Sequence, residues 1–208
     1  SEDASPALLP VPGGVDSDAL SAALQRLRDP EKRLIDEVFW FCAVEEASAE
    51  NSGLEALRSG DRRAAAKVWM GIHDDGGPKG SLALHNLAVL ALVGVIDSEI
   101  DERDGLLDGE RRQMLGHLWE VTFQRWMELR KTPGYWTALT DRVHELDDAR
   151  LSDGVVWDIR RTRPEALATV AAQLAISLFW AGKTAACVRI FEALWASEVP
   201  TPDARRAV

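Results

Sequence analysis

"DPEKRLIDEVFWF", residues Asp29 to Phe41, is the stretch of sequence that decides the fold. Asp-Pro is typical of a helix start, since the aspartate side chain accepts hydrogen bonds from free backbone N–H groups and proline suits the first helical position. Beyond this start, Leu34, Val38 and Phe41 recur at helical spacing, and two more aromatic residues flank that face. Such a wide apolar face predicts a buried helix between two layers of a helical bundle.

Helical periodicity continues through nearly all of the chain after Val15. The longest apolar run, from Leu82 to Ile96, is at or below the minimum length of a membrane span and predicts a buried central helix. Pro133 and Pro164 each begin a further predicted helix. No strand alternation or hairpin-turn signal competes with these patterns. The sequence therefore predicts an all-α fold, a helical bundle or solenoid of about nine or ten helices.

Two predicted helical hairpins share one pattern. Residues 54–72 align without gaps with residues 176–194, so that Trp69 meets Phe191 and a glycine stands at each turn. A small residue lets two helices cross closely, glycine makes the turn, and the aromatic ring fills the groove between the helices. This pattern resembles the second half of a tetratricopeptide repeat. Because only two such units occur, and not in tandem, we expect two tetratricopeptide-like hairpins within a bundle rather than a long superhelical array.

Composition limits the class of function. The 208 residues carry a formal net charge of −10, which argues against nucleic-acid binding and against docking on anionic membranes. The two cysteines, Cys42 and Cys187, lie far apart in apolar helical contexts, so we expect reduced core residues in a cytoplasmic protein. The beginning of the sequence lacks the basic and then apolar pattern of a secretory signal.

The two ends of the chain differ in composition from its middle. Residues 1–15 are rich in proline and glycine without periodicity, and they predict an extended linker or arm. Residues 16–198 predict a single all-α helical domain, and residues 199–208 predict a flexible C-terminal tail. Within the domain, the composition of residues 73–81 predicts a loop. The acidic residues 97–110 depart from a calcium-binding loop pattern, and they predict a solvated acidic loop.

His73 and Asp74 form a pair of the kind that binds metal in phosphohydrolases. His85 and His117 could complete such a site if the fold brought them together. This leaves open a metal-dependent, phosphohydrolase-like helical enzyme that uses these four residues. Ordinary turn chemistry explains His73 and Asp74 more simply, because aspartate and glycine are common at helix ends. We expect His85 and its neighbour Asn86 to satisfy backbone groups in the core.

The only basic cluster beside a tryptophan follows Trp157 and consists of Arg160, Arg161 and Arg163. Tryptophan and arginine are favoured interface anchors, and arginine pairs well with carboxylate or phosphate groups. These four residues are therefore predicted to bind a protein or peptide partner. The alternative is that the arginines pair with the chain's own carboxylates. The sequence contains no complete catalytic, nucleotide-binding or zinc motif, so no cofactor is expected.

Several stretches resemble a known family: "LQRLRDPEKRLIDEVFWF", "ALRSGDRRAAAKVW", "LHNLAVLAL", and "LTDRV" with "ELDDARL" after Trp136. The chain is similar to a largely uncharacterised bacterial family of actinobacterial type, in which helical regions of this kind are associated with J-domain-like segments. The resemblance covers most of residues 18–195 and implies a scaffold or a co-chaperone-like adaptor. The chain lacks the His-Pro-Asp tripeptide by which J-domains stimulate Hsp70 chaperones. Any chaperone activity would therefore require another part of the protein or a partner.

The sequence as a whole favours a non-enzymatic protein-interaction or scaffold module. Its expected partner is another protein or a peptide, with a component of a chaperone system as one candidate. The metal-dependent enzyme remains an alternative from a different class. A third possibility is an obligate oligomer subunit, in which self-association buries exposed tryptophans. Eight tryptophans are enough to serve both the core and such an interface.

Overall fold

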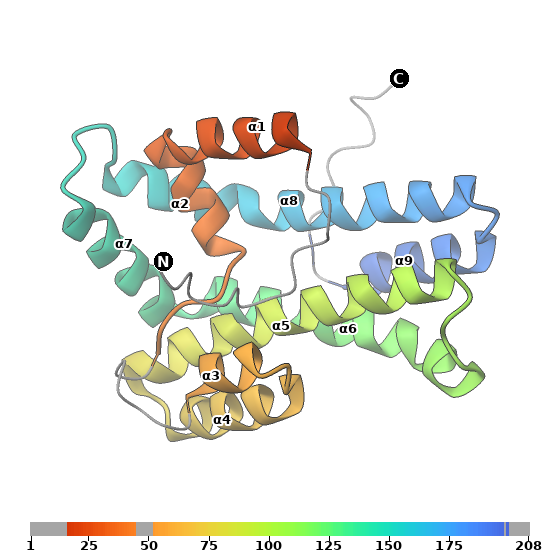
Figure 1. Ribbon diagram of the computed structural model, residues 1–208. Coiled ribbons are helices and arrows are strands. Elements are labelled where there is room, and N and C mark those ends of the chain that lie inside the picture. Colours follow the sequence, from red (N-terminus) through yellow and green to blue (C-terminus); the bar gives the residue numbers. More distant parts are fainter. Residues whose placement is uncertain (1–15, 45–51, 198, 200–208) are drawn as a thin grey trace, which may run out of the picture. The chain divides into compact units, whose positions relative to one another are not determined.

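The computed structural model describes residues 16–44, 52–197 and 199, and over these residues it contains α-helices and no strand (Figure 1). The all-α fold class is therefore confirmed. Predictions about residues 1–15 and 200–208 lie outside the described part of the chain. The described helices are α1 (Ser17–Leu27), α2 (Pro30–Val38), α3 (Gly53–Arg58), α4 (Arg62–Asp75), α5 (Gly77–Arg103), α6 (Gly109–Lys131), α7 (Pro133–Leu146), α8 (Asp153–Trp180) and α9 (Thr184–Ala196).

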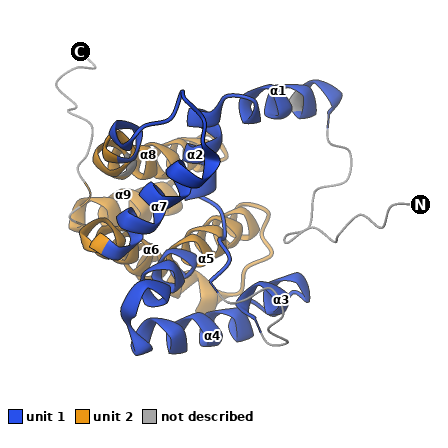
Figure 2. Ribbon diagram, turned by 90° about the vertical axis from the view of Figure 1, so that its left-hand side faces the viewer, with its two compact units in different colours: residues 1–87, 134–156 blue, residues 88–133, 157–208 orange. Residues whose placement is uncertain are grey.

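The chain divides into two compact units, and each unit is discontinuous in sequence (Figure 2). Unit 1 takes its described residues from 1–87 and 134–156. Unit 2 takes its described residues from 88–133 and 157–208. The boundaries fall inside α5 and α8, so these two helices each continue from one unit into the other. The single domain predicted for residues 16–198 stays a prediction.

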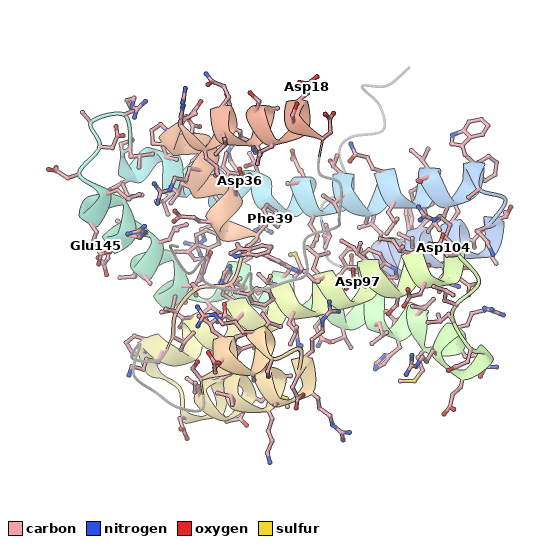
Figure 3. All side chains as sticks on the ribbon, viewed as in Figure 1. Asp18, Asp36, Phe39, Asp97, Asp104 and Glu145 are labelled. Atoms are coloured by element: carbon pink, nitrogen blue, oxygen red, sulfur yellow. The ribbon has the colours of Figure 1, made fainter. Side chains whose placement is uncertain are left out.

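Helix α2 ends at Val38, and Phe39 follows it as the C-terminal cap (Figure 3). The backbone N–H and C=O of Cys42 pair instead with the side chain of Asn86 on α5, at 2.9 and 2.8 Å. A continuing helix would use these backbone groups within its own ladder, so the Asn86 contact accounts for the early end. The predicted helix through Phe41 is therefore wrong in its last turn.

The aromatic residues after α2 differ in burial. Phe41 is buried, and its ring stacks on that of Trp69 of α4 with centroids 5.5 Å apart. Trp40 is exposed. In α2 itself, only Leu34 and Val38 are buried, so the helix has a narrow apolar stripe and not the wide apolar face that the sequence predicts.

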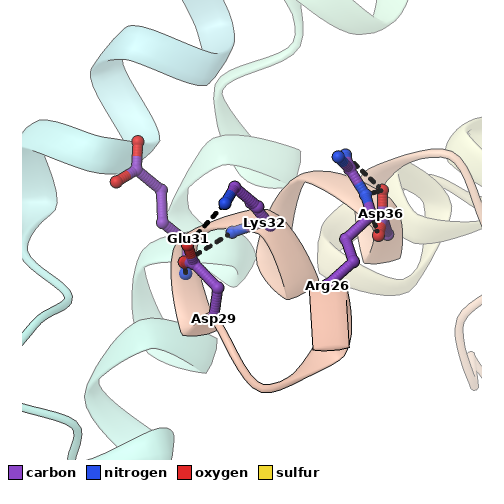
Figure 4. A network of polar contacts seen from close by, with 5 residues as sticks. All are labelled: Arg26, Asp29, Glu31, Lys32 and Asp36. Atoms are coloured by element: carbon purple, nitrogen blue, oxygen red, sulfur yellow. Dashed lines mark hydrogen bonds and ion pairs between the residues drawn. The ribbon is translucent and has the colours of Figure 1, made fainter. Parts of the chain in front are cut away.

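The predicted helix start at the Asp-Pro pair is confirmed. Asp29 Oδ1 accepts hydrogen bonds from the backbone N–H groups of Glu31 and Lys32 (Figure 4). A bidentate ion pair between Arg26 and Asp36, with an Nε–Oδ2 distance of 2.8 Å, joins α1 to α2. Both side chains of this pair are exposed, so it fixes geometry more than it adds stability.

Helices α3 and α4 form the first predicted hairpin. The turn between them contains Gly60 with a φ of 82°, a left-handed conformation that glycine adopts without steric cost. Leu57 and Trp69 are buried. Gly53 lies directly against the Trp69 indole, so a Cβ atom added at Gly53 would collide with the ring. The small residue of the predicted pattern is therefore required by the close helix crossing.

Two predicted helix boundaries are corrected by the structure. The loop predicted for residues 73–81 is almost entirely helical, because only Gly76 separates α4 from α5. Gly76 and Gly77 have φ values of 75° and 71°, so the chain turns at these two glycines. The helix start predicted at Pro164 is also wrong, since α8 runs through this proline. Proline removes one backbone N–H, but the buried Leu167 and Ala168 in the next turn hold the helix together by packing.

The acidic stretch 97–110 is also corrected. Helix α5 continues as far as Arg103, so that Asp97 lies on the helix and Asp104 follows its end (Figure 3). Glu99 has no exposed surface. It accepts a hydrogen bond from Trp119 Nε1 of α6 at 3.0 Å and pairs with Arg189 of α9 at 2.8 Å. A buried carboxylate thus joins three helices of unit 2 where the sequence predicts a solvated loop.

The buried helix predicted for residues 82–96 is confirmed within α5. Among the described residues, α5 is the one helix that is long and apolar enough to cross a membrane by length and composition. Its most apolar window is 61% buried, as in the core helix of a bundle. His85 and Asn86 lie among these buried residues and bond backbone groups of residues 38 and 42. Their predicted role in the core is therefore confirmed.

Candidate functional site

The predicted basic cluster lies in the part of α8 that belongs to unit 2. The Trp157 side chain is 63% exposed, and the Arg161 guanidinium carbon lies 5.3 Å from the centroid of the tryptophan ring. Arg161 also forms an ion pair with Asp158 at 3.3 Å. Arg160 is exposed, and the Arg163 side chain lies outside the described part of the structure. The structure thus brings Trp157 and Arg161 together, and it gives Arg161 a carboxylate partner from the chain itself.

The three histidines among the predicted metal ligands each have a separate partner. His73 Nδ1 lies 3.3 Å from the backbone oxygen of Gly80, and His85 Nε2 lies 2.8 Å from the backbone oxygen of Val38. The exposed His117 lies 3.6 Å from Glu120 on its own helix. Across the described residues, no group of three or more histidine, cysteine, aspartate or glutamate side chains could hold a metal ion. The structure therefore does not assemble the site that His73, Asp74, His85 and His117 were expected to form.

A larger feature lies on the second hairpin, where α8 and α9 run side by side (Figures 1 and 2). Trp180 is 80% exposed and Trp195 is 86% exposed. Four further apolar side chains on the hairpin are exposed to between 43% and 51%. We call this set the α8–α9 apolar face: Ile176, Phe179, Trp180, Val188, Phe191 and Trp195.

Helical spacing produces this face. On α9, the side chains at 186, 190, 193 and 194 are buried, and α9 packs against α6. Val188, Phe191 and Trp195 recur at i, i+3 and i+7, so they form a second stripe that points away from the buried one. On α8, Ile176 and Trp180 are one helical turn apart. Both helices are therefore apolar on a side that unit 2 leaves uncovered.

The first hairpin shows how an equivalent position can be covered. Trp69 aligns with Phe191, and Leu57 aligns with Phe179. In the first hairpin both residues are buried, and Phe41 stacks on Trp69. In the second hairpin Phe179 and Phe191 are 49% and 43% exposed. Two segments with one sequence pattern thus differ in whether an aromatic side chain covers them.

A groove of about 750 Å³ lies between α6 and the end of α9. Phe123 and Met127 contribute apolar side chains, and Glu120 and Glu128 contribute carboxylates. Ala193 also lines the groove, and it belongs to the buried side of α9 that packs toward α6. The groove is therefore a separate feature of unit 2, on the side of α9 opposite to Val188, Phe191 and Trp195.

Sequence reasoning missed the apolar face because it assigned most tryptophans to the core. The available signal was the width of the apolar surface on α9, which carries Ile190 on one side and Phe191 on the other. Helical periodicity identifies such residues as apolar on two sides, but only the position of α6 shows which side is covered.

Comparisons with models of protein families, with curated proteins and with solved structures found no match to this chain. The resemblance to a J-domain-associated family therefore stays a prediction.

Proposed function

We propose that the chain is a non-enzymatic protein-interaction module, and that the α8–α9 apolar face is its docking surface. The observation that carries this proposal is the exposure of Trp180 and Trp195, at 80% and 86%. Scattered single apolar residues are common on protein surfaces, whereas several large exposed ones on one helical hairpin favour an interaction site. Tryptophan is also among the residues that contribute most of the binding energy at interfaces.

The size of the face supports a protein partner. An aromatic side chain buries about 150–250 Å² when it is fully covered. With their exposed fractions, the six side chains would offer roughly 700 Å², close to the ~800 Å² that each partner contributes to a standard interface. A small ligand would leave most of this surface in water. The face therefore suits an extended segment or a helix of another protein.

The first hairpin supports a more specific partner chemistry. Phe41 covers Trp69 from a non-helical segment whose neighbouring backbone is fixed by a polar side chain. A partner segment with an aromatic residue and flanking apolar residues would cover Phe191 in the same manner. A chaperone-system component is the partner class that the family resemblance implies, and the tetratricopeptide-like pattern of the hairpins is consistent with a scaffold or adaptor.

The test compares two pairs of substitutions. The wild-type chain captures proteins from native cell extract, and the binding of each captured protein is measured again with both proteins purified. We expect Trp180→Ser with Trp195→Ser to weaken binding at least about 100-fold, since interface tryptophans each contribute about 2 kcal/mol or more. The matched control, Trp157→Ser with Arg161→Ser, removes another exposed tryptophan and its neighbouring arginine, which lie outside the face.

Each outcome has a defined meaning. Loss of binding in the first pair alone supports docking at the apolar face. Loss in the control pair alone would assign the partner to the basic cluster after Trp157 and would contradict the proposed surface. If light scattering shows a concentration-dependent dimer that the first pair abolishes, the occupant is a second copy of the chain and not a different protein.

A further inference from the structure

Cys42 lies beside His85 in unit 1, whereas the docking surface proposed above belongs to unit 2. Its Sγ atom is 3.5 Å from His85 Nδ1 and 3.5 Å from Asn86 Oδ1. The Asn86 amide also holds both backbone polar groups of Cys42, at 2.9 and 2.8 Å. The thiol is thus attached to a backbone position that two hydrogen bonds fix in place.

The partner of the other imidazole nitrogen determines what His85 can do. His85 Nε2 lies 2.8 Å from the backbone oxygen of Val38. Because a carbonyl oxygen only accepts hydrogen bonds, Nε2 carries the hydrogen, and in neutral imidazole Nδ1, 3.5 Å from the Cys42 sulfur, is then the nitrogen without a hydrogen. His85 is buried, and its ring stacks on Tyr135 with centroids 4.9 Å apart. The imidazole is therefore held with a basic nitrogen facing the thiol.

A cavity gives small molecules access to this pair. Cys42 and His85 line a cavity of about 400 Å³ in unit 1, with Tyr135 and Leu82 among its other lining residues. Cys42 is partly exposed and not fully buried, which corrects the expectation of a core cysteine. The volume lies within the range of small-molecule sites in proteins.

The charges around the cavity select among small molecules. Three carboxylates line it, those of Glu37, Asp141 and Glu145. One guanidinium, that of Arg142, lies among them at 3.5 Å from Glu37 and 3.6 Å from Glu145. The formal balance of the charged side chains that line the cavity is negative. Positively charged molecules are therefore attracted to it, and anions are repelled.

We propose that Cys42 is a site of thiol–disulfide exchange with small, positively charged disulfides. The thiol proton passes to His85 Nδ1 as the sulfur attacks one sulfur of the disulfide. The S–S bond of the small molecule breaks, and a mixed disulfide forms on Cys42. The departing sulfur is reduced and takes the proton to leave as a thiol, while the Cys42 sulfur is oxidised. This reaction reversibly places a cationic group in the cavity.

The chain contains its own control for reactivity. Cys187, on α9, is also partly exposed, and no histidine contact with it is recorded among the described residues. Both thiols can be followed in the same sample by peptide mass spectrometry after an acid quench. The probes are cystamine, a cationic disulfide, and dithiodipropionate, an anionic one of similar size.

We expect cystamine to modify Cys42 about tenfold faster than Cys187 near neutral pH, because a positioned base raises the thiolate fraction. Cystamine should modify Cys42 at least about threefold faster than dithiodipropionate at low ionic strength, and added salt should reduce this ratio. Glu145 is exposed, and Glu145→Gln should also reduce the ratio of the cystamine rate to the dithiodipropionate rate at Cys42. His85→Gln should slow Cys42 to the rate of Cys187 and leave Cys187 unchanged.

Equal rates at the two cysteines would contradict the proposal, and so would an unchanged Cys42 rate in folded His85→Gln. Equal rates with the two disulfides would contradict the assigned charge of the substrate. If His85→Gln does not fold, the pH profile of the wild-type chain decides. Rates that rise in parallel at both cysteines from about pH 6 to about pH 9 would show that His85 gives no activation.

Discussion

At the scale of single residues, the turn after α7 contains a carboxylate with an unusual titration. Asp148 accepts hydrogen bonds from Arg150 through Nε at 2.9 Å, Nη2 at 2.7 Å and the backbone N–H at 3.0 Å. These bonds stabilise the charged carboxylate and lower the pKa of Asp148 from its ordinary 3.8 to about 2, with the side-chain bond to Arg150 as the largest cause.

This shift predicts how the turn responds to acid. Because the pKa is lowered in the folded chain, the stabilising contribution of Asp148 is complete above pH 3.8 and is lost as the pH falls toward about 2. Arg150→Gln should raise the pKa of Asp148 toward its ordinary value, as measured by carbon NMR of the carboxyl group. Arg161→Gln, which removes another exposed Asp–Arg pair, should leave the Asp148 titration unchanged. An unshifted Asp148 in Arg150→Gln would contradict the assigned cause.

At the scale of elements, close helix crossing in the first hairpin depends on one glycine. Gly53→Ala would place a methyl group against the Trp69 indole, so we expect a loss of about 1–3 kcal/mol in the free energy of unfolding. Gly71, on the neighbouring helix α4, has open space around it. Gly71→Ala should therefore stabilise by about 0.5–1 kcal/mol through helix propensity. Denaturant unfolding of both variants tests the difference, and two equal effects would contradict the crossing geometry.

The buried carboxylate that joins three helices gives another element-scale prediction. Arg189→Met removes the cation from Glu99, which has no exposed surface, and should lower the free energy of unfolding by about 3–5 kcal/mol. Combining it with Glu99→Met removes the unpaired charge as well, so the double variant should recover much of the loss. Thermal unfolding of the single and double variants forms the test. A double variant less stable than Arg189→Met would show that Glu99 acts mainly through Trp119.

The same scale shows how much the sequence could predict. Caps such as Asp29 and turn glycines such as Gly60 act within a few residues, so the start of α2 and the first hairpin were predictable. The end of α2 depends on Asn86, which lies far away in sequence and replaces helix hydrogen bonds. Glu99 is buried because of Arg189. Contacts between residues so far apart in sequence leave no signal in the local pattern. The apolar face was missed because its exposure depends on where α6 packs against α9, which is also a long-range contact.

At the scale of the whole molecule, burial is unevenly distributed among the tryptophans. Trp69 and Trp119 have no exposed surface, whereas Trp180 and Trp195 are almost fully exposed. The acidic net charge of −10 opposes nonspecific association of such apolar surface, because like-charged chains repel. The net charge therefore limits self-association of the chain through the α8–α9 apolar face.

The interleaved units affect the order in which the chain can fold during synthesis. Residues 88–133 leave the ribosome between the two parts of unit 1. Synthesis adds about 5–20 residues per second, so α7 of unit 1 is made several seconds after the first part of that unit. No single cut of the gene releases either unit with all of its segments. Halves of the protein expressed separately should therefore regain structure only when they are mixed.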